Sequence, residues 1–233
     1  MSKTLRETLN TGSNKSAASR QRQRRQLLVG SAVSIAWPAL AAARRVLAPM
    51  TDGPFYPPRA WRERWPDQDA DLTRTSGPAS GVLTARGEHL GLDVTVLDTQ
   101  GRPIDGATVE IWQCDVQAAY RHPDVALVPG RHDPGFQGWG AARSDRAGAL
   151  RLRTIRPVPY PGRTPHIHVK LRHAAFGELT SQLFVAGDAG NERDGLWRRI
   201  ATEDRPTLEM TLQPAPAESG LRWRVSQVLV VPA

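Results

Sequence analysis

Two histidines stand two positions apart in residues 166–171, where His166 and His168 alternate with Ile167, Val169 and Leu171. A strand with this alternation directs both imidazoles to one face, about 6–7 Å apart along the chain. At that spacing both rings can bind one cation, so the pair predicts a metal-chelating unit. The plainer alternative is a pair of histidines on a solvated strand face.

The three tyrosines of the chain, Tyr56, Tyr120 and Tyr160, bear on which metal would bind. Tyr160 has a proline on either side just before the histidine strand, and these prolines favour an extended loop that holds the phenol at small entropic cost. Tyr120 follows the predicted strand that ends at Trp112. A phenol has a reference pKa of about 10, so losing its proton near neutral pH needs a strongly Lewis-acidic ion. Phenolate and imidazole ligands suit ferric iron better than zinc.

These motifs resemble those of the intradiol ring-cleavage dioxygenases, in particular the protocatechuate 3,4-dioxygenase type. Trp112 followed by Tyr120 looks like the family's stretch with its first tyrosine ligand. Residues 154–161 resemble the loop with the second tyrosine, and residues 163–168 resemble the family's arginine and two histidine ligands. The resemblance extends from about Gly53 to Val185 and is weak beyond that point.

The resemblance implies a mononuclear Fe(III) site with four protein ligands, which would be Tyr120, Tyr160, His166 and His168. Tyr160 and His168 would be the axial ligands. The implied reaction uses O₂ to open a small aromatic diol between its two hydroxyl-bearing carbons, giving a cis,cis-muconate-type diacid. Tyr160 would accept a substrate proton, Arg163 would stabilise negative charge on the ring, and Gln182 would hydrogen-bond near the ligands.

The substrate pocket is the part in which this sequence departs from the resemblance. Gly162 stands where protocatechuate enzymes carry a bulky aromatic residue, and the connection from Tyr160 to His166 is shorter than theirs. Tyr56 and Trp112 are further candidates for substrate contact, with ordinary packing as the alternative for each. The sequence therefore predicts a catechol-type substrate without saying which one.

Two other functions stay open at this stage. Residues 98–112 also resemble transthyretin-like repeats, which would make the chain a non-enzymatic β-sandwich binding module. A zinc hydrolase could use His166 and His168, but no acidic third ligand or general base lies at a recognisable spacing.

The elements that would position these residues are predicted to be short strands separated by Gly-, Pro- and Asp-rich connections. The predicted strands are residues 92–96, 107–111, 149–155, 166–172, 179–185 and 222–231. Only residues 191–202 look helical. We therefore expect an all-β protein, with a β-sandwich over residues 81–233, an irregular arm over residues 44–80 and little helix.

The charge distribution excludes a nucleic-acid partner. The net charge is +8, but residues 1–45 hold nine Lys and Arg against the single acid Glu7, and the remainder carries 22 basic and 22 acidic residues. The excess is thus confined to one end of the chain, where it does not make a basic binding surface on the body.

Residues 1–43 have the three parts of an export signal: a basic region, an apolar stretch and small residues at the end. Arg24 and Arg25 resemble a twin-arginine signal, which predicts export of the folded protein to the periplasm or beyond and a mature chain without a stable membrane span. A retained anchor is the alternative. The single cysteine, Cys114, excludes an intramolecular disulfide and is expected to be a packed residue. Whether the chain forms a homo-oligomer is left open.

Overall fold

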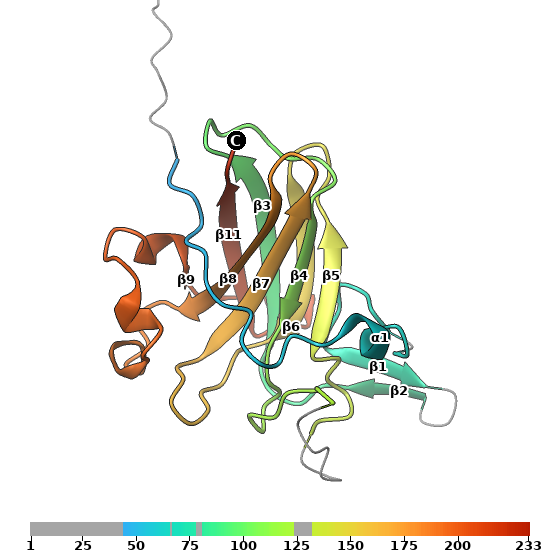
Figure 1. Cartoon of the computed structure of the whole chain (residues 1–233). Coiled ribbons are helices and arrows are strands. Elements are labelled where there is room, and N and C mark those ends of the chain that lie inside the picture. Colours follow the sequence, from blue (N-terminus) through green and yellow to red (C-terminus); the bar gives the residue numbers. More distant parts are fainter. Residues whose placement is uncertain (1–43, 66, 78–80, 124–131) are drawn as a thin grey trace, which may run out of the picture. The chain divides into compact units, whose positions relative to one another are not determined.

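The computed structural model describes residues 44–65, 67–77, 81–123 and 132–233, and the predicted export signal lies outside them. Two sheets pack on one another around a shared apolar core (Figure 1), which confirms the predicted all-β sandwich. The first sheet has the order β10 (Gln213–Pro214), β11 (Trp223–Val231), β3 (His89–Asp98) and β6 (Ala149–Ile155). The second has the order β5 (Trp139–Arg143), β4 (Thr108–Trp112), β7 (His166–His173), β8 (Gly177–Val185) and β9 (Glu209–Met210). A separate hairpin consists of β1 (Arg74–Gly77) and β2 (Gly81–Thr84).

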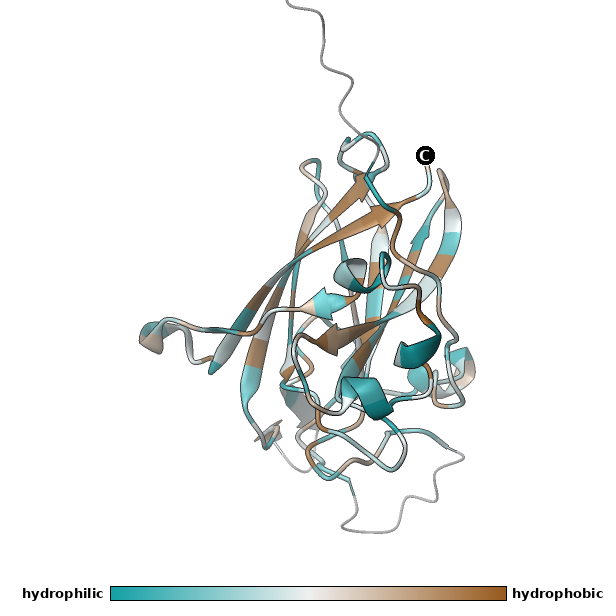
Figure 2. Cartoon of the chain, turned by 90° about the vertical axis from the view of Figure 1, so that its left-hand side faces the viewer, coloured by the Kyte–Doolittle hydropathy of each residue, from teal (hydrophilic) through white to brown (hydrophobic). Residues whose placement is uncertain are grey.

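The alternating residues of the strands explain why the sheets pack. β3 buries Leu92 and Val94, and β7 buries Ile167 and Val169, so apolar side chains from both sheets meet in one cluster. Figure 2 shows apolar stretches along the strands of the sandwich. Neighbouring strands pair antiparallel except β11 with β3 and β8 with β9, which are parallel.

The described part of the chain has little helix, and one sequence prediction fails here. The only α-helix among the described residues is α1 (Arg59–Arg62), and the 3₁₀ turns there are η1 (Asn191–Arg193), η2 (Trp197–Arg199), η3 (Arg205–Thr207) and η4 (Ala217–Ser219). The helix predicted for residues 191–202 is wrong. Asp194 between η1 and η2 is extended, and its carboxylate accepts the amide hydrogens of Leu196 and Trp197, so a second turn starts there. None of these helices has the length and apolar character that a bilayer crossing requires.

The first part of the arm, from Arg44 to Pro58, runs past β11 and then across the second sheet before it reaches α1 (Figure 1). The amide of Met50 donates to the carbonyl of Thr180 on β8, and Ser181 Oγ donates to the carbonyl of Ala48. The arm then crosses the outer face of β7 and β8, where Nζ of Lys170 donates to Asp52 and Nε2 of Gln182 donates to the carbonyl of Thr51. That face therefore lies under the arm instead of facing solvent, and this is the face that carries both histidines.

Candidate active site

The register of the second sheet sets a row of three side chains across three strands. Trp112 on β4 pairs with His168 on β7, and His168 pairs with Gln182 on β8. The indole of Trp112 lies almost parallel to the imidazole of His168, with ring centroids 4.7 Å apart and an interplanar angle of 12°. All three side chains are buried. The strand pairing itself thus fixes the position of His168.

The two predicted tyrosines converge on the other histidine. The phenol oxygens of Tyr120 and Tyr160 each lie 3.5 Å from Nε2 of His166. The rings of His166 and His168 are 4.9 Å apart between centroids. Nδ1 of His166 lies 2.7 Å from the carbonyl oxygen of Thr164, so it carries the hydrogen and leaves the Nε2 lone pair directed at the phenols. The structure therefore brings the four predicted metal ligands together.

A tight turn places Tyr160 next to Arg163. The backbone amide of Arg163 donates to the carbonyl of Tyr160, with Pro161 and Gly162 between them. Gly162 has a φ of +79°, and a proline followed by a residue with positive φ is the pattern of a type II turn. The same turn lets Nη1 of Arg163 donate to the phenol oxygen of Tyr160 over 3.3 Å.

Tyr120 is held by a loop between β4 and β5 and by the arm. The carboxylate of Asp115 accepts the amide hydrogens of Gln117 and Ala119, which folds the chain just before Tyr120. The ring of Phe55 stacks on Tyr120 with centroids 4.7 Å apart. The arm is therefore part of the site.

Burial favours the neutral form of all four groups. It raises the pKa of Tyr120 well above the usual value and also raises the pKa of Tyr160, although Arg163 opposes the second shift. Burial, together with the charge of Arg163, lowers the pKa of His166 to about 4, and burial likewise lowers the pKa of His168. Both imidazoles are thus neutral at neutral pH with lone pairs available. The phenols need a strong Lewis acid nearby to ionise.

This donor set fits ferric iron. Two phenol oxygens and two imidazoles are hard and borderline ligands, and a trivalent ion supplies the charge that would ionise buried phenols. Nδ1 of His168 is buried and has no hydrogen-bond partner among the described residues. Such a group costs about 1–3 kcal/mol, so His168 suits a ligand better than a packing residue.

Three partners fix the guanidinium of Arg163. Nε donates to Oδ2 of Asp194 over 2.9 Å, and Nη2 donates to Oε1 of Gln182 over 2.5 Å. Nε2 of Gln182 in turn donates to the carbonyl of Thr51 in the arm over 3.0 Å. The remaining nitrogen, Nη1, points at Tyr160. Arg163 and Gln182, predicted on resemblance alone, thus lie together beside the tyrosine.

A pocket of about 470 Å³ opens beside Tyr160, between the turn that contains Gly162 and residues 188–194. A Cβ atom added to Gly162 would meet nothing within 4 Å, so the glycine leaves space there. Of the three residues predicted to contact substrate, only Gly162 lines this pocket.

Tyr56, which lies in the arm, joins instead a polar network with β4 and β7, and Trp112 packs against its ring. The hydroxyl of Tyr56 donates to Glu110 over 2.7 Å and accepts from Arg172 over 3.1 Å. Its ring lies edge-on to Trp112 with centroids 4.8 Å apart, and Nζ of Lys170 is 4.0 Å from its centre. Tyr56 therefore contacts the indole that stacks on His168, one layer away from the predicted ligands.

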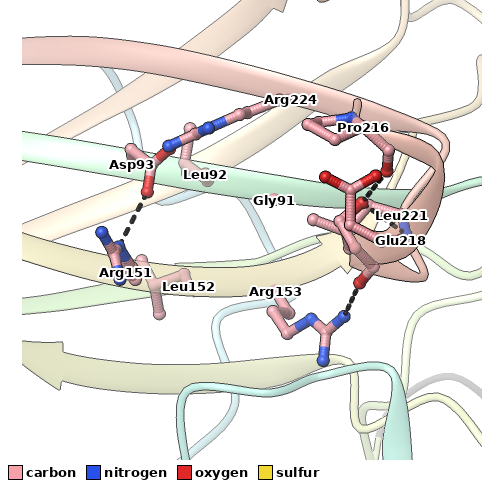
Figure 3. A pocket seen from close by; sticks show the side chains of 11 residues that line it. Gly91, Leu92, Asp93, Arg151, Leu152, Arg153, Pro216, Glu218, Leu221 and Arg224 are labelled. Carbon is pink, nitrogen blue, oxygen red and sulfur yellow. Dashed lines mark hydrogen bonds and ion pairs between the residues drawn. The ribbon is translucent and has the colours of Figure 1, made fainter. Parts of the chain in front are cut away.

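A second hollow of about 450 Å³ lies on the first sheet, away from the four predicted ligands. Figure 3 shows Asp93 between Arg151 and Arg224, with the Arg153 side chain reaching the segment that contains Glu218. Asp93 pairs with both Arg151 and Arg224, and Arg153 donates to the carbonyl of Ser219. Asp93, Arg151 and Arg224 are thus engaged with one another.

Sequence reasoning missed or misjudged other residues near the site. Asp194 contacts Arg163 from 31 positions away, and no motif or spacing in the sequence indicated it. No pattern in the sequence indicated that His122 is buried, yet it lies buried beside Phe55 and Trp61. The arm, whose course the sequence does not show, covers the loop that contains it.

Comparison with known proteins agrees with this geometry. Residues 53–217 match the family model described as Dioxygenase. The protocatechuate 3,4-dioxygenase beta chain of Burkholderia cepacia is 34% identical over 197 residues, which cover 76% of this chain and 83% of that one. The hydroxyquinol 1,2-dioxygenase of Corynebacterium glutamicum is 29% identical over 138 residues, or 52% of this chain. The match spans only 43% of that second relative's length.

Solved structures share the fold. The dioxygenase domain of a carbohydrate-binding fusion protein from Streptomyces sp. SirexAA-E superposes with a TM-score of 0.58 and 25% identity, covering 81% of this chain and 99% of that chain. An intradiol ring-cleavage dioxygenase from Tetranychus urticae, at 19% identity, has a TM-score of 0.58 over 81% of this chain and 95% of its own, which shows the fold alone.

The chain belongs to the intradiol ring-cleavage dioxygenase family. It is an oxidoreductase, as the tyrosine and histidine motifs predicted. The two alternatives, a non-enzymatic binding module and a zinc hydrolase, are wrong.

Proposed function

We propose that the chain binds Fe(III) and cleaves a catechol-type aromatic with O₂ to a cis,cis-muconate-type diacid. The proposed ligands are Tyr120, Tyr160, His166 and His168. The observation that carries the proposal is the convergence of both phenol oxygens on Nε2 of His166, at 3.5 Å each. Enzymes of this family depend on iron, and the residues present fit that ion.

Ferric iron, when bound, would supply the Lewis acidity that ionises the phenols and the diol. Tyr160 is the half-buried phenol of the pair and also lines the pocket, so its oxygen is placed to accept a proton from a substrate hydroxyl. Tyr120 is fully buried under Phe55 and would remain a fixed ligand. Trp112 and Phe55 pack against His168 and Tyr120, respectively.

Arg163 would stabilise negative charge that develops on the substrate ring. Its Nη1 lies 3.3 Å from the oxygen of Tyr160, and the other two nitrogens are held by Asp194 and Gln182. A cation fixed before the reaction costs no reorganisation when charge appears. Gln182 would keep the guanidinium of Arg163 in place.

The substrate would be a substituted catechol that enters beside Gly162. The open space at Gly162 would admit a ring substituent where an aromatic residue would otherwise stand. Protocatechuate and hydroxyquinol, the substrates named for the two relatives above, are suitable first candidates together with unsubstituted catechol.

The purified protein provides the test of this function. We expect about one iron per chain, a visible charge-transfer band and O₂ consumption matched by formation of a ring-opened diacid from one of these diols. An iron-free, colourless preparation with full ring-cleaving activity would refute the iron proposal. An iron-loaded, coloured protein that opens no catechol would refute the catalytic one.

We further propose that residues 1–43 direct export through a twin-arginine route and are removed, so that the enzyme acts in the periplasm or outside the cell. The support is the charge excess at this end of the chain, with seven Lys and Arg against the single acid Glu7 in residues 1–43, and the Arg24-Arg25 pair. Replacing both arginines by lysine should leave the precursor in the cytoplasm while activity is retained. Unchanged export of that variant would refute the route.

A further inference from the structure

The buried carboxylate of Asp194, near the site, accepts four hydrogen bonds. Its side chain has no exposed surface. Oδ1 accepts the amide hydrogens of Leu196 and Trp197, which caps η2. Oδ2 accepts Nε of Arg163 over 2.9 Å and the amide hydrogen of Thr164 over 3.0 Å. Oδ1 thus binds the backbone at the start of η2, and Oδ2 binds Arg163 and Thr164 in the site.

The two contacts of Oδ2 act on the same short stretch of chain. Thr164 also donates its hydroxyl to Oδ1 of Asn191 over 2.8 Å, so the backbone here is anchored a second time. Nε of Arg163, by contrast, has a hydrogen bond only to Asp194 among the described residues. Removing the carboxylate would therefore free the guanidinium more than the backbone.

The orientation of the Arg163 guanidinium depends on its hydrogen bond to Asp194. A planar guanidinium has a fixed arrangement of donors, so holding Nε and Nη2 determines where Nη1 points. Asp194 holds Nε, Gln182 holds Nη2, and Nη1 then lies 3.3 Å from the oxygen of Tyr160. If only Gln182 held the guanidinium, the guanidinium could rotate about its hydrogen bond to Gln182.

We propose that Asp194 is a positioning residue, which acts by aiming the guanidinium of Arg163 at the oxygen of Tyr160 and at the substrate bound there. The inference rests on the proposed role of Arg163 in ring cleavage. Asp194 lines the pocket beside Tyr160, but both of its oxygens already accept hydrogen bonds from the protein, so it acts on the substrate through Arg163. Burial alone would raise its pKa, but hydrogen bonds from Thr164 and Arg163 lower it, so the group is ionised at neutral pH.

A double-mutant cycle on the iron-loaded enzyme tests this role. Arg163→Ala should lower kcat by about 10²–10³-fold. Asp194→Asn should lower kcat by about 10–100-fold, as is typical when the partner of a functional group is removed. Because Asp194 acts through Arg163, the double variant should be no slower than Arg163→Ala alone. Iron content and the visible band should stay unchanged in Asp194→Asn.

A matched control is Asp204→Asn. Asp204 also pairs with an arginine, Arg45, but on the surface. This variant should leave kcat unchanged. A fall in kcat equal to that of Asp194→Asn would show a general effect of losing an ion pair and overturn the proposal.

Chemical rescue adds a measurement that a structural role would not affect. Guanidinium added to Arg163→Ala should raise turnover, because Asp194 and Gln182 still offer their oxygens, and it should not do so in the double variant. If Asp194→Asn does not fold, the comparison of guanidinium with urea on Arg163→Ala remains. The buried carboxylate should select the cation, so equal rescue by urea, or no rescue by guanidinium, overturns the proposal.

The outcomes separate the two claims. If Arg163→Ala keeps its kcat, the proposed function of Arg163 fails and the positioning role falls with it. If Arg163→Ala loses turnover while a folded, iron-loaded Asp194→Asn keeps it, only the positioning role fails. Loss of iron from Asp194→Asn would show that Asp194 supports the ligands instead, and this too overturns the proposal.

Discussion

The indole of Trp112 lies face to face on the imidazole of His168, with 4.7 Å between ring centroids and 12° between planes. The two residues are direct cross-strand partners in β4 and β7. A flat aromatic surface at this point restricts rotation of the imidazole, so the stack and the proposed iron site depend on one another.

Replacing Trp112 by leucine should therefore weaken iron binding by about 10–100-fold, the range typical for residues that orient a metal ligand. Trp112→Phe should retain most of the affinity because a stacked ring remains. Competition with a chelator measures the affinity. Trp223→Phe, on the other sheet, is the control, and an unchanged affinity in Trp112→Leu would contradict the dependence.

Tyr120→Phe should shift or remove the visible band of the iron-loaded enzyme, because charge transfer from that phenolate to the ion would be lost. The matched control is Tyr56→Phe, which removes the hydroxyl that pairs with Glu110 and Arg172. That variant should keep its band. A spectrum that responds to Tyr56 and not to Tyr120 would refute the ligand assignment.

Arg163→Lys should recover little of the turnover lost in Arg163→Ala, because an ammonium on a flexible stem cannot reach Asp194, Gln182 and Tyr160 in one plane. Single-turnover kinetics from the preformed substrate complex isolate the ring-cleaving step. Arg198, exposed on η2, provides the control, and its alanine variant should react at the original rate. Equal rates in the lysine variant and the unmodified enzyme would show that charge alone is needed.

Glu110 should contribute strongly to stability. It is buried and accepts hydrogen bonds from Tyr56, Trp139 and Arg172. Glu110→Ala leaves these donors unpaired and should lower the free energy of unfolding by about 3–5 kcal/mol, as for other broken buried ion pairs. Urea denaturation measures it. Glu63→Ala, at an exposed pair with Arg59, should change stability by only about ±0.5 kcal/mol.

The contribution of Asp194 to stability should depend on pH. Its pKa in the folded state is lowered, so the ionised carboxylate stabilises the fold above the unfolded-state pKa of about 3.9. This contribution is lost as the pH falls through the folded value. The stability difference between the unmodified protein and Asp194→Asn should thus be largest near neutral pH and shrink below about pH 4. A difference that stays constant down to acid pH would contradict this reading.

What could be predicted from the sequence depended on local patterns. The strand with His166 and His168 follows from alternation over eight residues, and the turn at Gly162 from adjacent residue types, so both are visible in short windows. β5 was missed because its sequence, Trp-Gly-Ala-Ala-Arg, has no apolar alternation; it is a strand through its pairing with β4.

Contacts between distant segments could not be predicted in this way. Glu110 reads as an outward polar position of β4, and its burial follows only from the arm that covers it. Asp194 meets Arg163 through the path of the chain after β8, a relation that no spacing in one sequence contains. The proposed ligands could nevertheless be identified, because the motifs of the family mark residues that such distant contacts bring together.

The arm contacts both Gln182 and Tyr120, and this has a consequence for release of the metal. Thr51 accepts a hydrogen bond from Gln182, Met50 binds β8 through its amide, and Phe55 covers Tyr120. Local unfolding of this segment would at once free Gln182 and expose Tyr120 to water. If the ion binds only while the arm is docked on the sheet, bound iron must slow hydrogen exchange at the Met50 amide. The rate at which the ion escapes is then set by how often the arm detaches from the sheet.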